Sequence, residues 1–163
     1  MTRHSIFAVV IAVFTVVATF AGGSGVASAD ISKNVIATFR GQIVVTKDEL
    51  PEAKSDKETI AKIKAAKLGE LAGTSNGDVT VWTFHYAAFL TKTGVNALKL
   101  EFWRDGKTYS ADKRLEGVDP KSGVLTGEIT IDEDENITKG KSYLIKLVAG
   151  ADTVVATATL VMK

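Results

Sequence analysis

The chain has 163 residues, with 20 Lys and Arg, 19 Asp and Glu, and no cysteine. Without cysteine it can form no disulfide, no thiolate metal site and no cysteine nucleophile. Arg3 is the only charged side chain before Asp30, so the rest of the chain holds 19 basic and 19 acidic residues. This balance argues against a nucleic-acid-binding protein, which carries a basic excess.

The first 29 residues have the layout of a secretory signal peptide. Arg3 precedes an apolar run at 6–21, and the small-x-small sequence ASA follows at 27–29. We therefore predict cleavage between Ala29 and Asp30, which leaves one domain, residues 30–163. The apolar run is shorter than the roughly 20 residues of a membrane-spanning helix, and no longer run follows. The expected product is a secreted or periplasmic protein with no membrane span after cleavage.

The first part of this domain is predicted to form a strand and then a helix. Residues 34–46 (NVIATFRGQIVVT) are rich in β-branched side chains and indicate the first strand, with Gly41 as a bulge or kink. Ser55 and Glu58 have the spacing of a capping box, and Gly73 is a typical helix stop. These signals predict one helix at about 56–72.

Residues 78–90 (DVTVWTFHYAAFL) are predicted to form a core strand. Alternation places Trp82 and Tyr86 on one face and Ala87 and Phe89 on the other, so both faces are substantially apolar. We expect both faces to be covered at least in part, the second by the helix at 56–72. His85, the only histidine after the leader, lies within this strand, and no nucleophile motif or second histidine accompanies it.

Residues 96–104 alternate between apolar and polar side chains, and the pair Asp105-Gly106 predicts a two-residue hairpin. That turn would set Phe102 opposite Tyr109, as a stacked pair on the core face. Trp103 falls on the outer face and is the sequence's candidate for an exposed contact with a ligand or partner.

Alternating segments continue at 124–131, 142–148 and 153–162, separated by polar loops. The whole domain then has about seven short strands joined by turns. This pattern is typical of a mainly β protein, an antiparallel β-sandwich.

The last two predicted strands carry a resemblance. Residues 140–148 (GKSYLIKLV) and 154–162 (VVATATLVM) resemble the last two strands of bacterial immunoglobulin-like domains. The layout of the domain is also similar to that of small secreted bacterial proteins with no assigned function. The resemblance implies an immunoglobulin-like β-sandwich, here with one helix (about 56–72) inserted after the first strand, and it implies no activity.

One loop has the spacing of a metal site. Asp132, Asp134 and Asn136 match the first three ligand positions of a calcium loop. The sixth position of that loop requires glycine and the twelfth a bidentate glutamate, whereas this chain has Ile137 and Tyr143. The alternative is a solvated acidic turn balanced by nearby lysines. Calcium is the one cofactor that the sequence suggests.

These observations predict an exported, non-catalytic binding or structural module that contacts a protein or a component of the cell envelope. Two alternatives stay open. One is a small exported hydrolase that uses two carboxylates in a cleft. The other is a β-sandwich stabilised by calcium.

Overall fold

The computed structural model describes residues 31–51, 53–91, 94 and 97–163, so the predicted leader and its cleavage site lie outside the described residues. The described chain is mainly β, as predicted, with nine strands where the sequence predicted about seven. The helices are α1 (Lys33–Phe39), α2 (Asp56–Ala66) and a short 3-10 helix, η1 (Glu133–Glu135). The strands are β1 (Ile43–Thr46), β2 (Glu70–Leu71), β3 (Thr74–Asn76), β4 (Val79–Phe89), β5 (Leu98–Arg104), β6 (Thr108–Leu115), β7 (Val124–Asp132), β8 (Lys141–Ala149) and β9 (Thr153–Met162).

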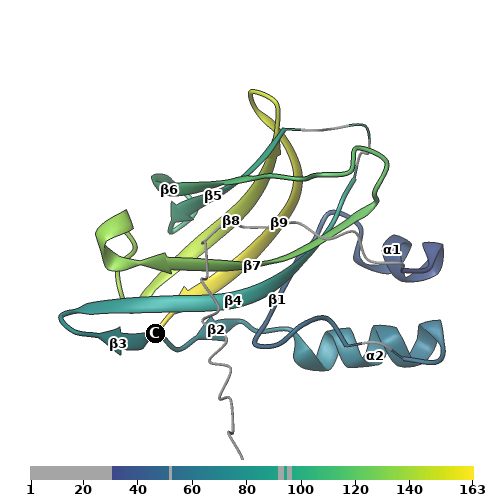
Figure 1. Cartoon of the computed structure of the whole chain (residues 1–163), viewed down its shortest axis with the longest axis horizontal. Helices are drawn as coiled ribbons and strands as arrows, with labels where there is room; N and C mark the ends of the chain where they lie inside the picture. Colours follow the sequence, from purple (N-terminus) through teal and green to yellow (C-terminus); the bar gives the residue numbers. More distant parts are fainter. Residues whose placement is uncertain (1–30, 52, 92–93, 95–96) are drawn as a thin grey trace, which may run out of the picture.

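The strands form two sheets (Figure 1). In the four-stranded sheet, β1 and β3 pair with one side of β4, and β7 pairs with the other side. The five-stranded sheet has the order β2-β9-β8-β5-β6. All of these pairings are antiparallel except that of β2 with β9. A parallel bridge between Gln42 and Thr157 links the two sheets along one side.

The main core contains side chains from both sheets. Alternate residues of β4, including Trp82, Phe84 and Tyr86, meet Phe102 of β5 and Tyr143 of β8 in one buried cluster. All five side chains are at most 2% exposed. Burying a large apolar side chain of this kind stabilises the fold by about 1.5–3 kcal/mol. The prediction that 78–90 is a core strand is confirmed.

A second, smaller core covers one end of the other face of β4. It is made of buried side chains from the two helices and from β1, β4 and the start of β7: Val35, Phe39, Val44, Ile63, Ala87, Phe89 and Val124. The rings of Phe39 and Phe89 lie 5.1 Å apart. Thr83 and His85 lie beyond this cluster and are exposed and half-buried. The second face of β4 is therefore covered only in part.

The predicted first strand, 34–46, is wrong in its first half, which forms α1. The Ser32 side chain caps this helix by accepting from the backbone N–H of Val35. Val35 and Phe39 are four residues apart, so a helix places both on one face, against the second core. Gly41 then adopts a φ of +79° and turns the chain from α1 into β1.

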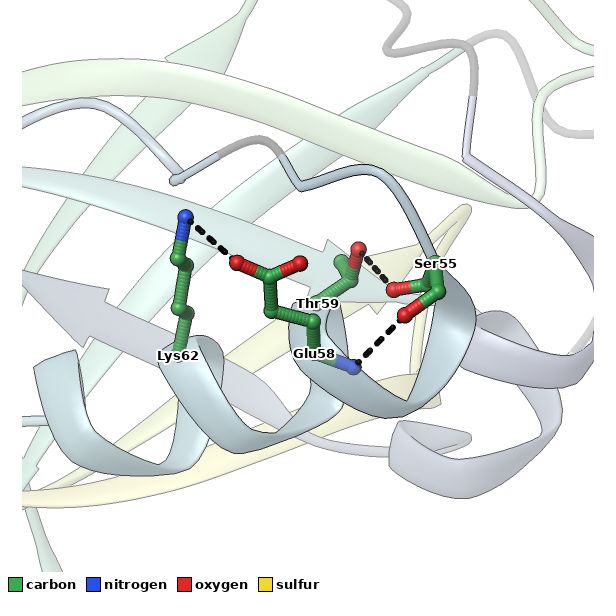
Figure 2. A network of polar contacts seen from close by, with 4 residues as sticks. All are labelled: Ser55, Glu58, Thr59 and Lys62. Atoms are coloured by element: carbon green, nitrogen blue, oxygen red, sulfur yellow. Dashed lines mark hydrogen bonds and ion pairs between the residues drawn. The ribbon is translucent and has the colours of Figure 1, made fainter.

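Helix α2 begins where the capping signal predicted (Figure 2). The Ser55 side chain accepts a hydrogen bond from the Glu58 backbone N–H at 3.3 Å, and the Thr59 hydroxyl donates to the Ser55 carbonyl at 3.0 Å. The Glu58 carboxylate is paired with Lys62 at 3.3 Å. The N-cap half of the capping box is thus formed, and Glu58 supports the helix through an i,i+4 ion pair.

The helix ends at Ala66, not at residue 72 as predicted. Lys67 leaves the helical conformation with a ψ of 123°, and the Leu68 N–H donates to the carbonyl of Val45. The chain continues extended so that Leu71 enters the main core while β2 pairs with β9. The pairing of β2 with β9 therefore replaces the last predicted turns of this helix. The prediction of a single helix is also wrong, because α1 precedes the first strand.

The hairpin of β5 and β6 differs from the predicted register. Asp105 and Gly106 do form the turn, with φ values of 51° and 69°, but Trp103 pairs with Tyr109 and Phe102 with Ala111. A bulge between these pairs shifts the strand by one residue. The predicted core stack of Phe102 on Tyr109 is wrong, because Lys107 also belongs to the turn. Arg104 therefore pairs with Thr108, and Tyr109 falls beside Trp103 on the outer face.

Across the part of the chain that the structure describes, the helices are too short and too polar to cross a membrane.

Candidate functional site

The outer face of the five-stranded sheet carries the most organised group of polar and aromatic side chains. Both described α-helices pack on the other sheet (Figure 1). The register places Tyr109, Trp103 and Leu144 side by side on β6, β5 and β8, and we call these three residues the aromatic row. The next level of the sheet carries Asp112, Glu101 and Lys146, which we call the charged row.

Trp103 is held in place by contacts on several sides. Its indole Nε1 donates to Glu101 Oε2 at 2.9 Å. The Lys146 ammonium lies 3.9 Å from the ring centroid, a cation–π contact. Tyr109 meets the ring edge-on at a centroid distance of 5.6 Å and an angle of 80°. The ring is half-buried, so a ligand would meet a tryptophan that has little side-chain entropy left to lose.

Tyr109 is the most exposed member of the aromatic row, at 48%. Its hydroxyl donates to the carboxylate of Asp112. That hydrogen bond, with burial and the charge of Asp112, raises the pKa of Tyr109 to about 12. The side chain is therefore neutral at physiological pH and fixed, with its ring open to solvent.

Glu101, the middle residue of the charged row, connects that row to the aromatic row through its hydrogen bond from Trp103. It is only 8% exposed and also accepts from Lys99 Nζ at 2.7 Å. Burial alone would raise its pKa, but the hydrogen bonds from Lys99 and Trp103, with the charges of Lys99 and Lys146, outweigh burial and lower the pKa below its ordinary value. The ionised carboxylate thus orients Trp103 and Lys99.

A depression of about 580 Å³ continues the surface at the far end of β5 and β6. Lys99, Arg114 and Glu116 provide its charged lining. Lys99 and Arg114 face each other across the two strands, and like charges directly opposite are unfavourable. Lys99 is already neutralised by its ion pair with Glu101 at 2.7 Å, and Glu116 adds a negative charge to the lining.

The acidic loop that suggested calcium uses its side chains within the protein. Asp132 caps η1 by accepting from the Glu135 N–H at 3.2 Å. Glu133 accepts from the Thr80 N–H at 2.8 Å, and Glu135 pairs with Lys113 of β6. The hydrogen bonds from Thr80 lower the pKa of Glu133.

Asp134 and Asn136 are exposed, and Asn136 has a left-handed φ of 63°. Over the described ranges, no group of three or more His, Cys, Asp or Glu side chains comes together to hold a metal ion.

His85 lies on the open part of the other sheet. Its Nε2 is 3.3 Å from Glu128 Oε2 on the neighbouring strand β7. Thr46, the residue opposite on β1, donates its hydroxyl to the Asp48 carbonyl at 2.6 Å. The Thr46 hydroxyl, which lies opposite His85, is thus bonded to a backbone carbonyl and not to the imidazole.

The structure keeps Trp103 where alternation predicted it and adds neighbours that sequence analysis missed. Tyr109 was missed because the turn contains one residue more, Lys107, than the Asp105-Gly106 signal indicates. Lys146 was missed because its contact with Trp103 joins two strands, β5 and β8, that are far apart in the chain. Glu101 is two residues from Trp103 on the same strand, so alternation already placed both on one face, but it gave no sign of the hydrogen bond between them. Comparison with known proteins gives no match, either to a protein-family model or to a curated protein.

Proposed function

We propose that this chain is an exported, non-catalytic binding module of the cell envelope or extracellular space. Its contact surface would be the outer face of the five-stranded sheet. Export is supported by the leader-like sequence at 1–29, with its predicted cleavage between Ala29 and Asp30. Binding is supported by the aromatic row and by the depression beside it.

We also propose that the fold is an immunoglobulin-like sandwich. The order of pairing supports this assignment: β1, β4 and β7 would correspond to strands A, B and E, and β5, β8 and β9 to C, F and G. Strand β6, beside β5, would occupy the place of C′ in variable-type domains. The two helices and the short strands β2 and β3 are additions to that plan.

Tyr143 gives the assignment a specific support. It lies near the start of β8, is 0% exposed, and its hydroxyl accepts from the backbone N–H of Thr138 at 2.8 Å. Immunoglobulin-like domains have a tyrosine corner at the start of strand F, in which the hydroxyl bonds to the backbone a few residues upstream. Because fold alone does not determine function, the tyrosine corner supports the architecture only.

The observation that carries the binding proposal is the fixed, exposed pair of Trp103 and Tyr109 on an open sheet face. Tryptophan and tyrosine dominate the energetic centres of protein interfaces, and rings that are already ordered lose little entropy on binding. Lys146 contacts the Trp103 ring and Asp112 accepts from the Tyr109 hydroxyl, so both rings are already ordered before any contact with a ligand.

Co-sedimentation of the mature chain with separated envelope fractions tests this proposal. Isolated wall polymer, vesicles of envelope lipid and soluble extract would each be mixed with protein at low and high salt. We expect saturable binding to one fraction. Trp103→Ala and Tyr109→Ala should each weaken it by about tenfold or more.

Thr83→Val is the matched control, because Thr83 is exposed on the opposite sheet. It should bind as the wild type does. Equal binding by wild type, both aromatic variants and the control would show that another surface is responsible. No binding to any fraction would reject an envelope ligand.

A further inference from the structure

The free edge of β7 has no counterpart elsewhere in the fold. Among the described residues no strand pairs with its outer side. β7 runs from Val124 to Asp132 and pairs with β4 over its whole length without a register shift. It contains neither proline nor lysine. A long, regular edge of this kind is a template for another strand.

The other sheet edges are protected in ways that natural proteins use. Strand β6 has a bulge and carries Lys113 and Arg114. β1 is joined to β9 by the bridge from Gln42 to Thr157. β2 and β3 are only two and three residues long. The regular edge of β7 lacks these protections and is therefore available to pair with another strand.

Hydrogen bonds at the end of β4 show which groups of β7 point outward. The Phe89 N–H donates to Gln42 and its carbonyl accepts from Gly41, so both groups of Phe89 face β1. Leu90 faces the opposite way, because its N–H donates to Gly123 before β7. Backbone groups alternate along a strand, so the even-numbered residues of β4 bond to β7. Their partners are Leu125, Gly127, Ile129 and Ile131.

The even-numbered residues of β7 therefore direct their backbone groups to the free edge. The first of them, Val124, is capped, since its N–H and carbonyl both bond to the Ser122 hydroxyl. The backbone groups of Glu128 and Thr130 have no partner within the described ranges. Their side chains reach back to β4, Glu128 to His85 at 3.3 Å and Thr130 to Thr83 at 3.0 Å.

We propose that a second copy of this chain pairs with β7 along this edge, antiparallel and about a twofold axis at Ile129. Glu128 of each copy then faces Thr130 of the other, and each of these two pairs exchanges both backbone hydrogen bonds. Ile129 meets its own copy on the core face. The two four-stranded sheets become one continuous sheet.

The choice of register follows from charge and from the Ser122 cap. A twofold axis at Glu128 would set Glu128 against its own copy, and like charges directly opposite are destabilising. An axis at Gly127 would need the outward groups of Val124, which Ser122 already occupies. A shift of this register by one residue would set residues of one copy whose backbone groups point outward against residues of the other copy whose groups point inward. The axis at Ile129 avoids all three conflicts.

The first experiment measures the oligomeric state of the mature chain by sedimentation over a wide range of concentration, up to millimolar. We expect a monomer–dimer equilibrium. Thr130→Pro removes one outward N–H, at a site where an edge strand tolerates proline, and should weaken the dimer by about tenfold or more. Thr130→Val also loses the contact with Thr83 but keeps the N–H, so it should dimerise like the wild type.

A wild-type chain that stays monomeric at millimolar concentration would overturn the proposal. So would a folded Thr130→Pro variant that dimerises as strongly as Thr130→Val, because the interface would then lie elsewhere. The aromatic row lies on the other sheet, so this inference stands apart from the proposed ligand binding.

A crosslinking experiment gives an answer even if Thr130→Pro does not fold. The chain has no cysteine, and Glu128 and Thr130 are both exposed. Glu128→Cys and Thr130→Cys proteins mixed under oxidising conditions should form a disulfide, because facing Cα atoms lie about 5.5 Å apart.

Each cysteine variant alone should stay uncrosslinked, because its two copies would be about 8–9 Å apart across the axis. Crosslinking only in the mixture supports the register. Equal crosslinking of a single variant, or none in the mixture, contradicts it.

Discussion

The hydroxyl of Tyr143 accepts a hydrogen bond from the backbone N–H of Thr138, five residues earlier, at 2.8 Å. This bond closes the turn between η1 and β8 and anchors it to the main core, where Tyr143 is fully buried. It also satisfies an N–H that lies between two strands. The phenol of Tyr143 thus anchors the end of a loop that Glu133 and Glu135 anchor at its start, through Thr80 and Lys113.

Tyr143→Phe should destabilise the fold by about 1–3 kcal/mol, because it leaves the Thr138 N–H without its acceptor while keeping the buried ring. Chemical denaturation followed by circular dichroism would measure the change. An unchanged midpoint would mean that solvent replaces the hydroxyl and that the corner has no energetic role.

Tyr86→Phe makes the same change at a contrasting site and should be neutral or stabilising by about 1 kcal/mol. The Tyr86 hydroxyl is buried with no hydrogen-bond partner among the described residues, and burial strongly raises its pKa. Removing it relieves an unpaid desolvation cost. The same denaturation assay applies, and a loss of stability similar to that of Tyr143→Phe would reveal a partner for this hydroxyl.

Gly73→Ala should destabilise the protein by about 1–3 kcal/mol through overpacking. A Cβ at this position would lie 2.4 Å from Thr80 Cγ2 and 2.8 Å from the Trp82 indole nitrogen. Gly69→Ala is the matched control, since a Cβ there meets nothing within 4 Å. Thermal melts of the two variants should differ clearly, and equal melting temperatures would show that the loop around Gly73 moves freely aside.

Glu101→Gln should lower stability at neutral pH by an amount on the order of 1 kcal/mol, because it removes the anion that Lys99 and Trp103 bond. The pKa of Glu101 is lowered in the fold, so its contribution is present above the ordinary value of 4.5 and is lost as pH falls through the lower folded value.

The difference between wild type and Glu101→Gln should accordingly shrink on acidification. Denaturation midpoints measured from pH 7 downward would test this. Glu116→Gln, at the residue directly after β6, is the comparison. A stability difference between wild type and Glu101→Gln that stays constant as the pH falls would contradict the role assigned to the Glu101 carboxylate.

Calcium should leave the melting temperature unchanged. A ligand that binds only the native state must raise stability, but Asp132 is engaged as the cap of η1 and Glu135 as the partner of Lys113. Melts in EDTA and in millimolar calcium would be compared. A clear rise with calcium would restore the site predicted at Asp132, Asp134 and Asn136.

The sequence by itself determined those features that depend on neighbouring residues. Ser55 marks the start of α2 because a cap bonds only three residues ahead. Alternation in β4 and β5 placed Trp82 in the core and Trp103 outside, because successive side chains of a strand face opposite ways.

Tertiary structure decided what depends on distant partners. Residues 33–39 have side chains suited to a strand or a helix, and packing against Phe89 favours the helix. Leu71 belongs to a strand because β9 is there to pair with it. The third turn residue of the β5–β6 hairpin, Lys107, set Tyr109 beside Trp103 on the outer face, and β8 brought Lys146 over the same ring. No local pattern encodes these contacts, so the proposed binding surface became visible only in the folded chain.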